Sequence, residues 1–286
     1  KLLKHSTSAQ RTHLASAVFL PDDSTYLLGA TADTGWRLLN NGMGDLKQTD
    51  LDKSKNFWQR SAYALGNKEA KFSIATPLHL DLFQGARYMP PGLQFTLTFY
   101  RTPPEFYILT KSVTRKFKIK IIDFKLEVNY VTLDGPIKSA ASSNKSFMVP
   151  YTKVGIQKRQ FPVGYTNLVF DICNGGVMPR QLLIAMVDTK AFQGEFASSP
   201  FLFNHYNCKE IGLRINGEPY PIEPLTMEFD KDALHYAYAY KHFLKNIGQN
   251  KRDSNFPITM ELYPFGHTLF AFDLSNDKSN NYHLNK

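Results

Sequence analysis

Apolar and polar residues alternate along much of the chain from residue 71 onward, which is the pattern of strands that bury one face. Residues 93–99 place an apolar side chain at every second position. Residues 117–130 repeat the alternation, with a change of phase at Ile122 that a β-bulge would accommodate. Further runs predict strands over residues 167–173, 181–188, 209–215, 258–263 and 267–274. The sequence therefore predicts a β-rich fold.

A β-hairpin is predicted at Asn216-Gly217, which follows the apolar run over residues 209–215. This dipeptide readily adopts the left-handed backbone conformations of a two-residue turn. Pro219 and Pro221 cannot donate hydrogen bonds to a ladder, so the returning strand should lie at the edge of a sheet or at the start of a loop.

Helical spacing of apolar residues is confined to three stretches. They are residues 6–20, ended by Pro21; residues 52–65, ended by Gly66; and residues 230–248, capped by Asp230 and ended by Gly248. In the third stretch Tyr236, Tyr238 and Tyr240 also alternate, so a strand over residues 234–240 is an alternative. Because short strands separated by turn residues outnumber these helices, we expect β-sandwiches rather than repeated βαβ units.

The composition fits a folded β protein with a basic surface. The chain has 286 residues, which allows one large β domain or two smaller ones, and 14% of them are aromatic, which favours strands. The chain carries 34 Lys and Arg against 25 Asp and Glu, a net charge of +9. This charge favours a polyanionic partner without identifying it.

Cysteine usage and apolar run lengths limit the classes of protein further. Cys173 and Cys208 are the two cysteines, so a disulfide framework is not expected and a reducing compartment fits. The longest apolar run, residues 182–187, is far shorter than the roughly 20 residues of a membrane-spanning helix, so we expect no such segment. The sequence opens on Lys1 rather than Met, and we expect an internal fragment of a longer chain.

Two partial patterns bear on catalysis and cofactor binding. Gly42-Met43-Gly44 begins like a dinucleotide-binding loop but has Lys47 where the third glycine belongs, so a flexible loop is the better interpretation. His79 and Asp81 would share one face of a strand and could orient a general base. No nucleophile accompanies them, so a structural hydrogen bond is favoured. We therefore expect no enzymatic activity, no catalytic residues and no cofactor.

Two further patterns concern metal binding and modification. His205 and Cys208 could donate to one metal ion, but structural zinc usually takes four ligands, so a buried free thiol near a loop histidine is favoured and no metal site is expected. Asn144-Lys145-Ser146 fits the N-glycosylation pattern, which matters only in a secretory compartment. We interpret it as a chance match.

Positively charged residues interleave with aromatic ones in the middle of the sequence. The cations are Lys111, Arg115, Lys116, Lys118, Lys120, Lys153, Lys158 and Arg159. Such mixing occurs on nucleic-acid-binding surfaces. Lys118 and Lys120 also alternate with apolar residues, so a solvated sheet face is the favoured interpretation. Any contact with nucleic acid would be to phosphates and independent of base sequence.

Several short motifs follow one another in the order in which a known family carries them. They are His79-Leu80-Asp81-Leu82-Phe83 followed by Gly92-Leu93-Gln94-Phe95, the lysine-rich stretch 117–128, Asp188-Thr189-Lys190-Ala191-Phe192-Gln193-Gly194, Asn204-His205-Tyr206-Asn207, Asn216-Gly217-Glu218 and Gly266-His267-Thr268-Leu269-Phe270-Ala271-Phe272-Asp273-Leu274. Over nearly the whole chain this order resembles the major capsid proteins of Maverick/Polinton elements and the related adintoviruses.

The resemblance implies an all-β fold of two tandem jelly-roll sandwiches, with helical excursions in the loops. Residues 1–112 would be the C-terminal portion of the first jelly roll, with loop and helix excursions. Residues 113–286 would be the second jelly roll without its last strand. On this reading the chain is truncated at both ends.

The resemblance also implies a structural protein of a virion capsid. Homotrimers would form pseudo-hexameric capsomers that tile an icosahedral shell around double-stranded DNA, with non-specific DNA contact. Further partners would be neighbouring capsomers and a penton or minor capsid protein. Assembly would take place inside the host cell, in the nucleus.

Two other interpretations stay open on the sequence. A β-sandwich could be a binding module for a glycan or a cell-surface partner, because fold does not fix function. A host-domesticated capsid relative would keep the sandwich and serve another role. Saturable binding on a glycan array would favour the binding module.

Overall fold

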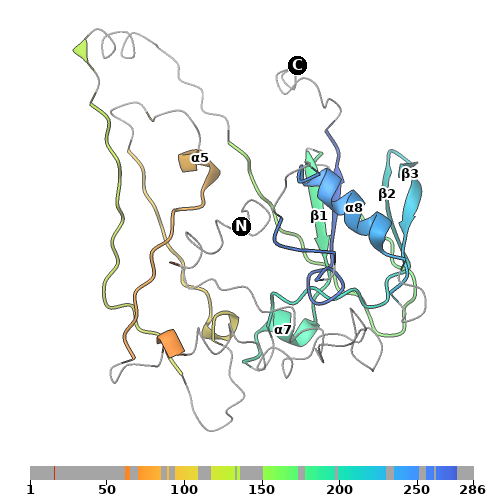
Figure 1. The fold of residues 1–286 in the computed structure, drawn as a ribbon, viewed down its shortest axis with the longest axis horizontal. Helices are drawn as coiled ribbons and strands as arrows, with labels where there is room; N and C mark the ends of the chain where they lie inside the picture. Colours follow the sequence, from red (N-terminus) through yellow and green to blue (C-terminus); the bar gives the residue numbers. More distant parts are fainter. Residues whose placement is uncertain are drawn as a thin grey trace, which may run out of the picture.

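The fold is that of a computed structural model, which describes Ser16 and residues 62–64, 70–84, 89, 94–108, 117–132, 134–135, 151–172, 178–196, 199–229, 235–250, 256–260 and 262–275. Among these residues, every strand lies between residues 181 and 273. Long extended segments from residues 71–132 lie on the opposite side of the molecule from the strands (Figure 1). Within the described part, no helix has both the length and the apolar character needed to cross a membrane.

The best-buried sheet pairs β1 (Gln181–Ala185) with β4 (Leu269–Asp273) in antiparallel register. Residues 269–272 of β4 are all buried, as expected for an apolar strand that is covered on both faces. In β1, half-buried and exposed side chains alternate, and Leu183 is exposed to solvent. The structure confirms the strand predictions for this pair, although β1 ends three residues before Asp188.

A second antiparallel pair is the hairpin of β2 (Glu210–Ile215) and β3 (Glu218–Thr226). Its turn is Asn216-Gly217, with φ angles of 53° and 90°, the left-handed conformations that a two-residue turn requires. Among the described strands β3 pairs with β2 alone, so Pro219 and Pro221 lie at a sheet edge, one of the two predicted places.

The long helix α8 (Ala237–Asn246) covers β4. Ala239 and Phe243 are buried four residues apart, while Tyr238 is exposed. The alternative strand over residues 234–240 is therefore wrong for its described part, because residues 237–240 are helical. The helix begins after Tyr236 rather than at the predicted cap, Asp230, which lies outside the described residues. It ends just before Gly248, whose φ of 74° agrees with the predicted stop.

Three short helices were not predicted from apolar periodicity. They are α5 (Asp81–Gln84), η4 (Pro104–Phe106) and α7 (Thr189–Gln193). The Asp188 carboxylate caps α7 by accepting a hydrogen bond from the Lys190 backbone N–H at 2.7 Å. Gly194 closes α7 in a left-handed conformation, with φ of 99°.

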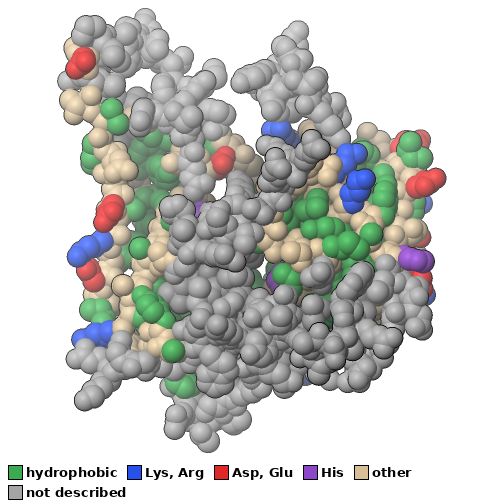
Figure 2. Space-filling model, viewed as in Figure 1, with side chains coloured by type: hydrophobic (Ala, Val, Ile, Leu, Met, Phe, Trp, Pro, Cys, Tyr) green, Lys and Arg blue, Asp and Glu red, His purple; other side chains and the backbone are tan. Residues whose placement is uncertain are grey.

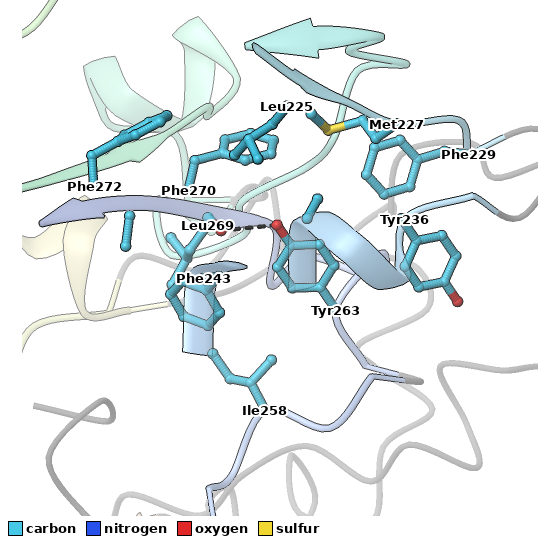
Figure 3. Packing of buried hydrophobic residues seen from close by; sticks show 12 residues of the cluster. Leu225, Met227, Phe229, Tyr236, Phe243, Ile258, Tyr263, Leu269, Phe270 and Phe272 are labelled. Atoms are coloured by element: carbon cyan, nitrogen blue, oxygen red, sulfur yellow. Dashed lines mark hydrogen bonds between the residues drawn. The ribbon is translucent and has the colours of Figure 1, made fainter. Parts of the chain in front are cut away.

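The hydrophobic core lies where β4, α8 and the end of β3 meet. Its buried residues are Leu225, Met227, Phe229, Tyr236, Ala239, Phe243, Ile258, Tyr263, Leu269, Phe270, Ala271 and Phe272. In Figure 3, Leu269 extends toward Phe243 and Tyr263, while Phe270 and Phe272 extend to the other side of β4. The buried Tyr263 hydroxyl donates to the Leu269 carbonyl at 2.9 Å, which satisfies both polar groups inside the core.

Three strand predictions are wrong. The described parts of residues 93–99, 117–130 and 167–173 belong to no strand, and Ile121 and Ile122 are both exposed instead of flanking a bulge. Alternation places side chains on two faces, but a strand also needs a partner backbone about 4.8 Å away. These segments have no such ladder with the other described residues.

The predicted strand over residues 258–263 is also wrong for its described residues, which form bends and turns instead. The Tyr263 N–H donates to the Thr259 carbonyl at 3.0 Å, and the Phe265 N–H donates to the Leu262 carbonyl at 2.9 Å. The Thr259 hydroxyl accepts from the Leu262 N–H at 3.3 Å. These local bonds replace the ladder bonds of a strand.

The structure agrees with the prediction of a mostly β fold. The described residues form short antiparallel strand pairs with few helices, which is a mostly β arrangement. Of the predicted helix over residues 52–65, residues 62–64 are helical and the rest lies outside the described residues, as does nearly all of residues 6–20. The expected domain boundary between residues 112 and 113 also falls outside them.

Candidate assembly surface

Among the residues that the structure describes, most of the exposed large apolar side chains belong to residues 94–101, 117–132 and 151–170, which we call the extended segments. Many of their large apolar side chains face solvent, and Figure 2 shows hydrophobic side chains open to solvent on the side of the molecule where residues 94–101 and 117–132 lie. Examples are Ile122, 72% exposed, Val154, 81% exposed, and Ile156, 91% exposed. Folded monomers rarely leave so many apolar side chains uncovered, so this surface is a candidate for contact with another protein.

Side-chain contacts hold two of the extended segments side by side. The rings of Phe99 and Phe124 meet edge to face, with centroids 5.1 Å apart. Arg101 crosses between the segments, because its guanidinium donates to the Ile119 carbonyl and, at 2.5 Å, to the Tyr107 hydroxyl. The guanidinium also lies 5.6 Å from the centre of the Tyr107 ring. This arrangement fixes the spacing of the exposed side chains without a backbone ladder.

Two contacts connect the same area to α5. Phe83 in α5 meets Phe95 edge to face at 5.8 Å. The Asp81 carboxylate accepts a hydrogen bond from the Thr152 backbone N–H at 2.7 Å. Segments more than 50 residues apart in sequence therefore converge on one short helix.

The exposed apolar side chains of the extended segments can contribute burial energy to an interface. Fully covering one large aliphatic or aromatic side chain contributes about 1.5–3 kcal/mol. Several such side chains covered together would outweigh the cost of ordering an interface, which is the energetic basis of most protein association. Their side chains project from extended backbone, which suits contact with a broad complementary surface.

The structure corrects the geometry expected for His79 and Asp81. Residue 79 is not in a strand and Asp81 begins α5, so the two do not share a strand face. The Asp81 carboxylate is bonded to the Thr152 amide, which is a structural role.

His205 and Cys208 lie on one tight turn, closed by a hydrogen bond from the Cys208 N–H to the His205 carbonyl at 2.9 Å. The His205 ring is buried and stacks on Phe229 at 4.3 Å, and its Nδ1 accepts from the Asn207 N–H at 3.0 Å. Cys208 is a free, half-buried thiol that donates to the Glu210 carbonyl, and burial raises its pKa. The structure shows the predicted free thiol near a loop histidine, although this thiol is half-buried rather than buried.

No metal-binding group of three or more His, Cys, Asp or Glu side chains occurs among the residues that the structure describes. Other predicted features fall outside that part of the chain. They are the Gly42-Met43-Gly44 loop with Lys47, the Asn144-Lys145-Ser146 pattern, Cys173, and the cations Lys111, Arg115 and Lys116.

Sequence reasoning missed a column of stacked rings behind this turn. His205 stacks on Phe229, Phe229 on Tyr236 with centroids 5.4 Å apart, and Tyr236 on Tyr263 at 6.3 Å. The four residues come from separate loops and element ends, so no single period in the sequence could have revealed the column. It fixes the turn at residues 205–208 against the core.

Comparison with known proteins gives one distant similarity. No family model matches the sequence, and no solved structure matches it. The chain is 26% identical over 213 residues to the uncharacterized protein F54H12.2 of Caenorhabditis elegans. The alignment covers 71% of this chain and 49% of that protein, so the chain spans about half the length of the curated relative it matches.

Proposed function

We propose that the chain is part of a structural capsid subunit that assembles with copies of itself through two of the extended segments, residues 94–101 and 117–132. The observation that carries this proposal is the set of large apolar side chains that these segments leave exposed. Wherever this protein is present, a second copy of it is available as a partner at the same concentration. Symmetric assembly of copies needs broad surface patches of this kind rather than a pocket.

The detailed form of the proposal is a tandem double jelly roll whose trimers make pseudo-hexameric capsomers of an icosahedral shell around double-stranded DNA. A penton or minor capsid protein would complete the shell. Three motifs that resemble the Maverick/Polinton family support this form, because they coincide with structured elements: residues 188–194 with α7, residues 216–218 with the hairpin turn, and residues 266–274 with β4. The antiparallel strand pairs also support it.

The test measures the oligomeric state of the purified chain with matched serine substitutions. Ile122→Ser combined with Val128→Ser removes two exposed side chains of residues 117–132. The control is Ile222→Ser, which removes a side chain of β3 that is 87% exposed but lies outside these segments. Native mass spectrometry and negative-stain imaging should show trimers or shells for the unsubstituted chain and the control, and a shift to monomers for the double variant.

A strictly monomeric unsubstituted chain under assembly conditions would refute the proposal. Trimers that the double variant retains as well as the control does would show that assembly uses another surface. Circular dichroism of all three proteins checks that the substitutions leave the fold intact.

A further inference from the structure

Residues 151–170 carry positive charge without any carboxylate. Lys153, Lys158 and Arg159 are the charged residues of this range, and the next charged side chain along the chain is that of Asp171. All three cations are exposed. A local charge of +3 within seven residues is well above the average for a chain of 286 residues with a net charge of +9.

Two of these cations are held in place by neutral groups. The Lys158 ammonium lies 5.5 Å from the centre of the Phe192 ring in α7, and the Arg159 guanidinium donates to the Asp171 carbonyl at 3.2 Å. An aromatic ring and a carbonyl oxygen orient a cation but do not neutralise it. The positive charge of this segment therefore remains available to an external anion.

The other exposed basic segment differs in its charge balance. Residues 117–127 contain Lys118, Lys120 and Lys125 together with Asp123 and Glu127. Lys125 lies 3.0 Å from the Asp123 carboxylate. The net charge of this stretch is thus 3 − 2, or +1, which makes it a weak anion site and a suitable control.

We infer that residues 153–159 dock on the phosphate backbone of duplex DNA, without reading its sequence. This inference rests on the proposed function, which supplies DNA as the enclosed partner. Duplex DNA carries one negative charge per about 1.7 Å of helix axis, and cations that neutralise it release condensed counterions. Three unneutralised cations on extended backbone match such a continuous row of charge, while none of them has a partner that would aim it at a base edge.

The experiment measures binding of the purified chain to a fluorescein-labelled duplex of about 20 base pairs by fluorescence anisotropy, from about 50 to about 200 mM NaCl. The test variant is Lys153→Gln, Lys158→Gln and Arg159→Gln together. The control is Lys118→Gln, Lys120→Gln and Lys125→Gln, which removes the same formal charge. The test variant should lower the slope of log K against log salt by about 2.7, at about 0.9 per phosphate contact, and the control by less than about 1.

A second variant distinguishes the effect of removing a positive charge from the effect of disturbing the contacts that hold Lys158 and Arg159. Lys153→Gln alone leaves the Phe192 and Asp171 contacts in place, and it should lower the slope by about 0.9. Native mass spectrometry of each variant shows whether assembly persists, so loss of DNA binding in intact trimers concerns this inference and not the proposed function. Equal slopes for the two triple variants, or tighter binding of a single strand than of the duplex, would overturn the inference.

Discussion

Phe99 and Phe124 meet edge to face at 5.1 Å, with their ring planes at 62°, although both side chains are more than half exposed. Their segments run side by side without a backbone ladder, so this contact and the Arg101 guanidinium are what bring them together. An edge-to-face pair gains from the attraction between the positive edge of one ring and the negative face of the other.

The first prediction is that Phe99 and Phe124 are energetically coupled. A double-mutant cycle of Phe99→Ala and Phe124→Ala should give an interaction energy of about 0.5–1 kcal/mol, at the low end for aromatic pairs because solvent reaches both rings. The measurement is the free energy of unfolding in urea for the four proteins. Additive effects of the two substitutions would show that the rings do not meet in solution.

The sequence predicted elements best where local chemistry decides them. Asn216-Gly217 forms its turn because both residues accept positive φ, and that preference belongs to the dipeptide itself. The β4 residues form a strand because they are apolar at consecutive positions and can be buried on both faces. In these places local preference and tertiary packing agree.

The sequence did not allow us to predict which distant segments pair with each other. Residues 117–130 have a clear alternation but gain no partner strand among the described residues, so their side chains stay exposed. The Asp81 carboxylate accepts a hydrogen bond from the Thr152 amide, 71 residues away, which no local pattern in the sequence predicts. Which segments approach each other depends on the whole fold, and alternation alone carries no information about it.

The second prediction concerns the packing of α8 on the core. Phe243 is fully buried, with its ring 5.8 Å from Phe256 and 6.0 Å from Tyr263. Phe243→Ala should therefore lower the free energy of unfolding by about 3–5 kcal/mol through lost burial and a cavity. The control is Tyr238→Ala on the same helix, where the side chain is exposed and the change should stay within about 0.5 kcal/mol. Urea unfolding followed by circular dichroism measures both, and equal losses would contradict this packing.

The third prediction is an alkaline loss of stability through Tyr263. Burial raises the pKa of the Tyr263 phenol, and the nearby Cys208 and Tyr240 raise it further when they ionise. A phenol whose pKa is higher in the folded state holds its proton more tightly there than in the unfolded chain. Its contribution is thus fully present below about pH 10, the ordinary value for tyrosine, and declines as the pH rises above it.

Tyr263→Phe removes this titration, so its free energy of unfolding should fall less steeply above about pH 10 than that of the unsubstituted chain. Below that pH the two proteins should differ by a constant amount of about 1 kcal/mol, the hydrogen bond from the Tyr263 hydroxyl to Leu269. Urea unfolding at a series of pH values measures both effects. Parallel curves at alkaline pH would show that Tyr263 is solvated in the folded protein.

The last prediction separates backbone strain from steric clash at two glycines. A Cβ added at either Gly217 or Gly155 would meet no heavy atom within 4 Å, so neither alanine is blocked by a neighbour. Gly217 has a φ of 90°, which L side chains rarely adopt, whereas Gly155 lies outside that region. Gly217→Ala should therefore lower the free energy of unfolding by about 1–2 kcal/mol, while Gly155→Ala should be neutral or slightly stabilising. If urea unfolding gave equal effects for the two, the Asn216-Gly217 turn would not have the left-handed conformation that sets the register of β2 and β3.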